Sequence, residues 1–383
     1  MPVHQLTRDE VRAAIRGTAY ADQTATTVSP VRLPHSIRRR GGDESIERMA
    51  GQTAGVRLEL LTSARTVVIE ALLTRSHPAA VSDDARPAVL VAVVDGREMD
   101  RRSFLNGPIV RQLPGGATEL VPGSVSVAGL SLGERTADPR VVEVWLPHVS
   151  ATEILSVRAD AAIAPAPPRD RPRWTHYGSS ISHGAEADGP TRTWPAVAAL
   201  ALDWDLTGLG LGGQAMVDPF VARVIRDTPA DLITLKLGVN VVNADAFRSR
   251  TFAPAVHGFL DTIREGHPET PVVVISPVAL PIHETTPGPT VIGPDGALTG
   301  TPDAGDRPGV LTLSAVRPAL ERVVAERDDP TVRYLDGRRL LGPDDTHHLH
   351  DRLHPDAAGH VLIGERFIDI ARGADWAPRR PPE

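Results

Sequence analysis

The spacing of apolar residues changes near residue 160, and this change limits the folds that the chain can adopt. Before that point, short runs with a period of two residues are separated by Gly, Pro and Asp clusters, as in VRLEL at 56–60 and RVVEVWLP at 140–147. Several such runs without long helices between them are typical of an antiparallel β-sandwich. The sequence therefore predicts an N-terminal sandwich domain over residues 1–160.

A different pattern follows the proline-rich stretch AAIAPAPPRDRPR at 161–173, whose composition suits a semi-rigid linker. Apolar runs of buried-strand type, such as DLITLKLG at 231–238, then alternate with helical segments. This alternation predicts an α/β domain in which helices cover both faces of a parallel sheet. The helical segments are 193–202, 215–227, 244–265, 312–327 and 356–372.

Composition excludes several classes of protein. The net charge of −7, without any basic tract, argues against a nucleic-acid partner. The absence of cysteine excludes a disulfide scaffold, a thiol nucleophile and a Cys-ligated zinc site. No run approaches the ~18 apolar residues of a membrane span, and the charged N-terminal segment lacks the apolar centre of a signal peptide. We therefore expect a cytoplasmic protein with a small-molecule partner and no membrane partner.

The first turn of interest in the α/β part is WTHYGSSISHGAEADG at 174–189, where Ser179 and Ser180 follow Gly178. Catalytic groups in such folds gather at the carboxyl ends of the strands. Serine and glycine are also common in ordinary turns, and a serine at the start of a helix often only caps it. This stretch alone leaves open whether one of the two hydroxyl groups is a nucleophile.

A second turn, TGLGLGGQAM at 207–216, contains the pattern G-x-G-x-x-G through Gly208, Gly210 and Gly213. A dinucleotide site would also need an acidic residue at the end of the next strand, roughly 20 residues further on. The acid of the next strand, Asp231, lies at the start of that strand. The sequence therefore disfavours a nucleotide site.

Two further strand ends carry polar residues. In LGVN, Asn240 ends the third turn, where an asparagine can simply cap the following helix. In DRLHPDAAGH, Asp351 and His354 are three residues apart, before a helix expected to begin at Pro355. An aspartate at this spacing can hold the imidazole in one tautomer.

A histidine cluster precedes this fourth turn. No carboxylate set at ligand spacing accompanies it, and we interpret it as a solvated loop rather than a metal site. The cluster consists of His347, His348 and His350.

The blocks GSSISHG, GLGLGGQ, GVN and DRLHP, in this order and at these strand ends, resemble those of the SGNH hydrolases, also called GDSL-type esterases and lipases. The resemblance covers residues 174–376 and implies a flavodoxin-like three-layer α/β/α hydrolase domain, followed by a tail at 377–383. The subtype with a jelly-roll-like β-sandwich ahead of the hydrolase domain, as in some carbohydrate esterases, is similar to the whole chain.

The resemblance also implies roles for individual residues. Ser180 falls on the position of the nucleophile, His354 on that of the general base, and Asp351 on that of the acid that orients the base. The backbone N–H groups of Ser180 and Gly213 and the side-chain amide of Asn240 fall on the oxyanion hole. Neither a metal nor a cofactor takes part in such a mechanism.

The chain departs from the family pattern at three positions, none of which is nucleophile, base or oxyanion donor. Ser179 stands where the family has the Asp of G-D-S, Val241 stands where Asp often follows the asparagine, and Gly208 stands where Asn is common. These departures affect the assignment to a subgroup more than the class of enzyme.

The activity that follows is hydrolysis of a short-chain ester, such as an acetyl ester, on a sugar or secondary metabolite through an acyl-Ser180 intermediate. Aromatic residues make up only 4% of the chain, and no large apolar funnel for long-chain lipids is visible. Two alternatives remain open at this stage. One is an acyltransferase that uses the same triad, and the other is a glycan-binding protein with a degenerate hydrolase domain.

The stretch 281–309 contains six Pro and six Gly and is expected to form neither helix nor strand. Loops of this length in a compact domain are usually functional or mobile. The stretch either overhangs the active site as a lid or acyl-selecting wall, or is a solvated insertion away from it.

Overall fold

The computed structural model describes residues 4–40, 44–113, 116–293, 297–302 and 307–379. The chain forms two compact units, one extending to Asp170 and including Gly189–Thr191, the other containing Arg171–Asp188 and the residues from Arg192 onward. We propose that these units are the two domains expected from the sequence. Parts of the long stretch (294–296 and 303–306) and of the tail (380–383) lie outside the described residues.

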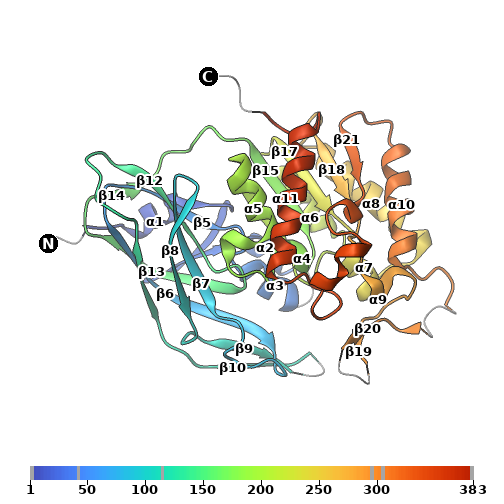
Figure 1. The fold of residues 1–383 in the computed structure, drawn as a ribbon, viewed down its shortest axis with the longest axis horizontal. Helices are drawn as coiled ribbons and strands as arrows, with labels where there is room; N and C mark the ends of the chain where they lie inside the picture. The colour runs from blue at the N-terminus through green and yellow to red at the C-terminus, as the bar shows by residue number, and fades with distance from the viewer. Residues whose placement is uncertain (1–3, 41–43, 114–115, 294–296, 303–306, 380–383) are drawn as a thin grey trace. The chain divides into compact units, whose positions relative to one another are not determined.

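The first unit contains two sheets whose described strands pair antiparallel, apart from one parallel pair between β6 and β9 (Figure 1). The first sheet consists of β1 (His4–Gln5), β3 (Tyr20–Gln23), β4 (Val28–Val31), β6 (Thr66–Pro78), β9 (Ile109–Gln112), β10 (Thr118–Val121), β11 (Ser126–Ser131) and β13 (Ser150–Ala159). The second consists of β2 (Ile15–Arg16), β5 (Arg57–Thr62), β7 (Ala88–Val94), β8 (Arg97–Phe104), β12 (Arg140–Trp145) and β14 (Ile163–Pro165). The unit also contains the helices α1 (Arg8–Ala14), α2 (His35–Arg38) and α3 (Glu44–Gly51).

Alternation of side chains builds the core of this unit. Along β6, buried and half-buried residues alternate, and Val67, Ile69 and Ala71 point into one apolar cluster with residues of β5, β7, β12 and β13. Strand β14 lies inside the stretch expected to be a linker and pairs with β5. Pro165 has no backbone N–H to donate. Because β14 is an edge strand, this missing donor leaves no partner strand unpaired.

The second unit is built on a parallel sheet with the strand order β16-β15-β17-β18-β21. Its strands are β15 (Arg173–Gly178), β16 (Asp205–Gly210), β17 (Leu232–Lys236), β18 (Val272–Ile275) and β21 (Val332–Leu335). The chain continues from β15 to β16 on one side and then to β17 on the other side. This reversal beside β15 creates the crevice at which ligands bind in folds of this kind.

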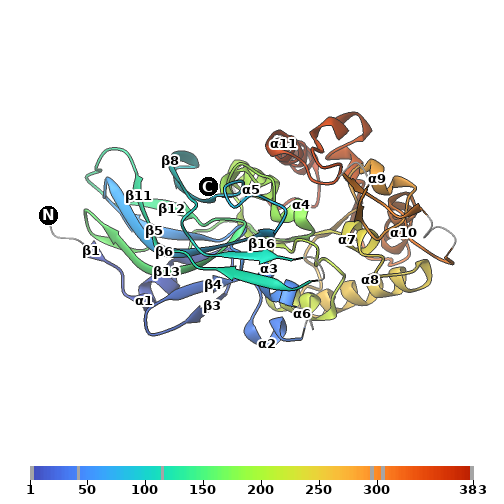
Figure 2. The ribbon, with the colours of Figure 1, turned by 90° about the horizontal axis from the view of Figure 1, so that it is seen from below.

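Helices cover both faces of this sheet, with α5 and α11 on one side and α6 and α8 on the other (Figure 2). Within β15, the Trp174 ring stacks on Phe367 of α11 at 5.1 Å, whereas the Tyr177 ring stacks on Phe259 of α8 at 5.4 Å. The helices are α4 (Ser180–His183), α5 (Trp194–Leu202), α6 (Pro219–Asp227), α7 (Val239–Asn243), α8 (Ser249–Arg264), α9 (Pro281–Glu284), α10 (Leu313–Ala325) and α11 (Ala357–Gly373). The expected three-layer α/β/α fold is therefore present.

Several helix boundaries differ from those expected. Helix α6 begins at Pro219 rather than 215, because the glycine-containing loop continues to Asp218, and α8 begins at Ser249 rather than 244. Helix α11 begins at Ala357 rather than Pro355, because the Asp356 carboxylate accepts the backbone N–H of Gly359 at 2.7 Å and caps the helix there.

The stretch 281–309 is not free of regular structure, contrary to expectation. It contains α9 and a short hairpin of β19 (Val291–Ile292) and β20 (Leu298–Thr299). The buried His283 stabilises this part of the stretch, since its Nε2 lies 2.7 Å from Thr290 Oγ1. Nowhere in the described ranges is a helix long and apolar enough to cross a membrane.

Candidate active site

Ser180 lies at the sharp turn between β15 and α4, at the carboxyl edge of the sheet. The backbone N–H groups of Ser182 and His183 donate to the carbonyl of Ser179 at 3.0 and 2.9 Å, which closes this turn. A Cβ atom on Gly178 would lie 2.2 Å from Ser182 Oγ, so only glycine permits the helix to begin so close to the strand. The turn leaves the Ser180 side chain half-buried rather than enclosed.

The loop before α11 brings His354 and Asp351 to Ser180. The Ser180 Oγ atom lies 2.9 Å from His354 Nε2, and His354 Nδ1 lies 2.6 Å from Asp351 Oδ2. A carboxylate can only accept at Nδ1, so Nδ1 carries the proton and Nε2 is free to accept from the Ser180 hydroxyl. The three residues form one hydrogen-bonded chain.

The Asp351 carboxylate is fixed by its own loop. Its Oδ1 atom accepts the backbone N–H groups of His354 at 2.6 Å and Leu353 at 2.9 Å. Partial burial works against ionisation, but these bonds and the His354 side chain outweigh it and hold the pKa of Asp351 well below its ordinary value. The carboxylate is therefore charged wherever the protein is folded near neutral pH.

Asn240, in the short helix α7 that follows β17, presents an unused donor. Its Oδ1 atom accepts the backbone N–H of Ala215 at 3.0 Å, which fixes the orientation of the amide. Its Nδ2 atom is buried and has no hydrogen-bond partner in the described part of the chain. Because a buried unpaired N–H group costs free energy, a ligand oxygen placed here would satisfy it.

Gly213 lies in the loop 211–218 that connects β16 to α6. The loop is tied to the nucleophile turn, since the Leu211 N–H donates to the Gly178 carbonyl at 2.7 Å. It is tied to Asn240 through Ala215, two residues after Gly213. Gly213 has a φ of +70°, in the left-handed region that favours glycine. The structure thus joins the loop of Gly213 to both other parts of the expected oxyanion hole.

The remaining glycines of the G-x-G-x-x-G pattern do not form a phosphate-binding turn. Gly208 and Gly210 are both part of β16 rather than of the loop after it. A Cβ on Gly210 would lie 2.3 Å from the backbone nitrogen of His183. Gly210 therefore permits close packing between β16 and the helix that carries Ser180.

A buried polar network beneath the nucleophile helix was not expected from the sequence. Thr234 Oγ1 accepts from the Trp174 indole at 2.8 Å and lies 2.6 Å from His176 Nδ1, while His176 Nε2 lies 2.8 Å from Ser182 Oγ. Burial, together with the charge of Lys236, lowers the pKa of His176 to about 3. The only available signal was a histidine inside a strand, which does not reveal its partners.

Lys236, the only lysine in the sequence, lies at the end of β17 with its amine buried. Its Nζ atom has no hydrogen-bond partner among the described residues. Burial, assisted by the charge of Arg317, lowers its pKa to about 7. The folded protein therefore releases between pH 7 and about 10 a proton that the unfolded chain keeps, and stability rises with pH through this window.

We therefore expect Lys236→Met to stabilise the protein at pH 7 by roughly 2–4 kcal/mol and by less at pH 10. Denaturant unfolding followed by tryptophan fluorescence measures this difference, because all tryptophans except Trp145 lie in the second unit. Equal stabilisation at both pH values would show that packing, not the buried amine, is responsible.

The histidine cluster before α11 has other partners. His348 Nδ1 lies 3.1 Å from Asp356 Oδ1, and His350 Nε2 lies 4.0 Å from a carboxylate oxygen of Glu186. Within the described ranges, no group of three or more His, Asp or Glu residues could hold a metal ion. The expectation that no metal or cofactor takes part stays a prediction.

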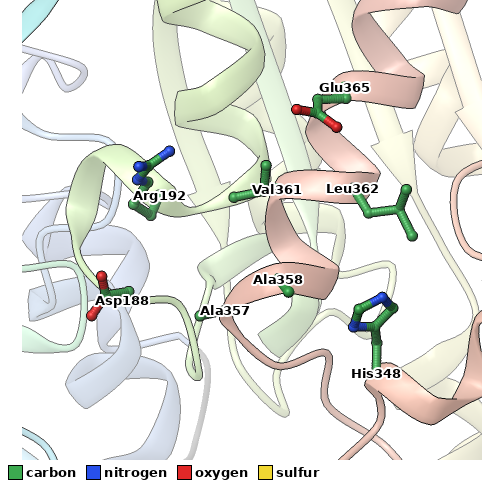
Figure 3. Close-up of a pocket in the computed structure, with 8 residues that line it drawn as sticks. All are labelled: Asp188, Arg192, His348, Ala357, Ala358, Val361, Leu362 and Glu365. Carbon is green, nitrogen blue, oxygen red and sulfur yellow. The ribbon is translucent and has the colours of Figure 1, made fainter.

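A pocket of about 520 Å³ lies on the outer face of the N-terminal half of α11 (Figure 3). Its lining residues are Asp188, Arg192, His348, Ala357, Ala358, Val361, Leu362 and Glu365. Neither Ser180 nor His354 contributes to this lining. The pocket is thus not the place where the hydrogen-bonded chain would act on a substrate.

The strand order and the position of the Ser180–His354–Asp351 chain at the carboxyl edge define an SGNH-type α/β/α hydrolase fold. Residues 176–362 match the GDSL-like Lipase/Acylhydrolase family. The match confirms the resemblance to the GDSL-type hydrolases inferred from the sequence. No functionally curated protein sequence matches the chain.

Solved structures are similar over both units. The salicylyl-acyltransferase SsfX3 from a tetracycline biosynthetic pathway is 28% identical, with a TM-score of 0.75 over 95% of this chain and 96% of that one. A putative GDSL-like lipase from Bacteroides ovatus is 17% identical, with a TM-score of 0.67 over 96% of both chains. A family two carbohydrate esterase from Clostridium thermocellum, solved with cellohexaose, is 14% identical, with a TM-score of 0.54 over 82% and 90%. The last two show a shared fold.

Proposed function

We propose that this protein cleaves a carboxylic ester through an acyl-Ser180 intermediate. The observation that carries the proposal is the continuous chain from Ser180 Oγ to His354 Nε2 at 2.9 Å and from His354 Nδ1 to Asp351 at 2.6 Å. As Ser180 attacks the carbonyl carbon, His354 takes the hydroxyl proton, and the charged Asp351 stabilises the resulting imidazolium. His354 then returns this proton to the leaving alcohol.

The tetrahedral intermediate carries a negative oxygen that needs donors. We assign the side-chain amide of Asn240 and the backbone N–H groups of Ser180 and Gly213 to this role. The buried, unpaired Nδ2 atom of Asn240 supports this assignment. Each such donor typically contributes ~3 kcal/mol of transition-state stabilisation.

The acyl group must then pass from Ser180 to an acceptor. Water is the first candidate for this acceptor, and with water the protein is an esterase. A short acyl group, such as acetyl, on a sugar or secondary metabolite is the substrate class proposed. Turnover of 4-nitrophenyl acetate by the purified protein tests the activity. Absence of turnover by a protein that nevertheless binds glycans would instead favour a non-catalytic binding protein.

Transfer of the acyl group to an alcohol is the second candidate. It is supported by the 28% identity over nearly the whole chain to a protein described as an acyltransferase. Mass spectrometry of products formed from a 4-nitrophenyl ester in the presence of candidate alcohols separates the two. An acylated alcohol that the Ser180→Ala variant does not form identifies transfer, and free acid alone identifies hydrolysis.

The neighbouring hydroxyl provides a matched test of the nucleophile. The Ser179 Oγ atom is buried and has no hydrogen-bond partner in the part of the chain that the structure describes. We expect Ser179→Ala to keep at least about half of the wild-type kcat, because no base is available to its hydroxyl. Initial rates on 4-nitrophenyl acetate measure this. An inactive Ser179→Ala beside an active Ser180→Ala would exchange the roles of the two serines.

A further inference from the structure

The loop 211–218, which carries Gly213, contains a strained residue one position before its end. Val217 has a φ of +59°, although left-handed backbone is costly for a side chain branched at Cβ. The other non-glycine residues with positive φ in the described ranges are Asp95, Asp203, Asp245, Asp328 and Arg352, none of them β-branched. Strain of this kind persists only where the surroundings hold it.

The hydroxyl of Tyr177 holds this residue. The backbone N–H of Val217 donates to Tyr177 Oη at 3.3 Å, and both residues are buried. The Tyr177 ring cannot easily move, since it stacks on Phe259 with its centroid 5.4 Å away. The bond therefore joins a rigid strand residue, three positions before Ser180, to the far end of the loop.

The same loop reaches Asn240 two residues earlier. The N–H of Ala215 fixes the Asn240 amide, and between the two bonds lies only Met216, whose N–H donates to the Gln214 carbonyl at 3.1 Å. Relaxation of Val217 toward negative φ would move Ala215 and Gly213 together. The Asn240 amide and the Gly213 N–H would then lose their positions.

We propose that Tyr177 is a positioning residue, whose hydroxyl holds Val217 in the left-handed conformation and thereby keeps the loop of Gly213 aligned with Asn240. This inference rests on the proposed function, in which these donors bind the oxyanion. Tyr177 itself touches no reacting atom in this scheme. Its loss should therefore affect the transition state more than substrate binding.

We expect Tyr177→Phe, which keeps the ring, to lower kcat on 4-nitrophenyl acetate about 10-fold with KM changed less than about 2-fold. Its affinity for a phosphonate transition-state analogue should fall in the same proportion as kcat. Val217→Gly in the Tyr177→Phe background should restore at least half of the lost kcat, because glycine adopts the left-handed conformation without strain. A double variant slower than Tyr177→Phe would overturn the inference, because strain at Val217 would then not be what Tyr177 controls.

Tyr334→Phe is the matched control. Tyr334 lies in the same sheet, and this substitution likewise removes a hydrogen-bonded hydroxyl, here one bonded to Ser276. Amide hydrogen exchange of the peptide 211–217 provides a readout independent of activity. Exchange should accelerate in Tyr177→Phe and not in Tyr334→Phe. Unchanged exchange in Tyr177→Phe overturns the inference. Accelerated exchange in a protein without esterase activity shows that Tyr177 holds the loop, and rejects the proposed function.

Discussion

Alanine in place of Ser180 or His354 is expected to lower kcat on 4-nitrophenyl acetate by a factor on the order of 10⁵ or more. Ser180 supplies the attacking oxygen, and without His354 its hydroxyl keeps its proton and remains a weak nucleophile. Because the two residues act as one unit, the double variant should be no slower than either single variant. Steady-state kinetics of the three variants measure this.

His347→Ala is the control for the histidine change, since His347 is exposed and its Nδ1 atom lies 3.1 Å from the Asp344 carbonyl. It should keep wild-type activity. If the losses in the two single variants multiplied in the double variant, Ser180 and His354 would act in separate steps.

Asp351→Asn is expected to reduce kcat by a factor on the order of 10⁴, as in serine proteases, with KM nearly unchanged. An asparagine amide can donate to His354 Nδ1 and so favours the tautomer whose Nε2 atom carries the proton. That tautomer cannot accept from Ser180. Asp344→Asn, a change of an exposed aspartate seven residues earlier in the sequence, is the matched control. A loss below 10-fold would show that the backbone of the loop orients His354 without the carboxylate.

The same substitution should affect stability in a pH-dependent manner. Folding lowers the pKa of Asp351, so its ionised form stabilises the folded state above the ordinary carboxyl pKa of ~4. This contribution decreases as the pH falls below that value toward the folded pKa. The difference in unfolding free energy between wild type and Asp351→Asn should therefore be largest at pH 7 and smaller at acidic pH. Denaturant unfolding at pH 7 and at a pH below ~4 measures this change.

The sequence was sufficient to predict the architecture where the pattern is local. Apolar alternation along β6 and the fully buried run of β7 mark a sandwich, and the apolar runs of β17 and β18 mark a parallel sheet. The pair Asp351 and His354 was visible because both belong to a single short loop. Its contact with Ser180, 174 positions away, followed only from the resemblance to a family.

Features that depend on distant neighbours were beyond sequence reasoning. The helical stretch expected from 215 includes Val217, whose left-handed backbone is held by Tyr177 from another element. Likewise, the sequence shows His176 only as a residue within a strand, whereas the structure places Thr234 and Ser182 beside its two ring nitrogens. The hairpin of β19 and β20 was missed because a segment rich in Pro and Gly carries little strand propensity, and its packing around His283 compensates for this.

The buried position of Lys236 has a practical consequence for chemical labelling. Because the chain contains no other lysine, Lys236 is its only side-chain amine, and reagents such as succinimidyl esters cannot reach it while β17 is covered. Once the second unit opens, the amine becomes accessible to them. The rate at which Lys236 takes up such a label therefore measures how often this unit opens, without any engineered probe.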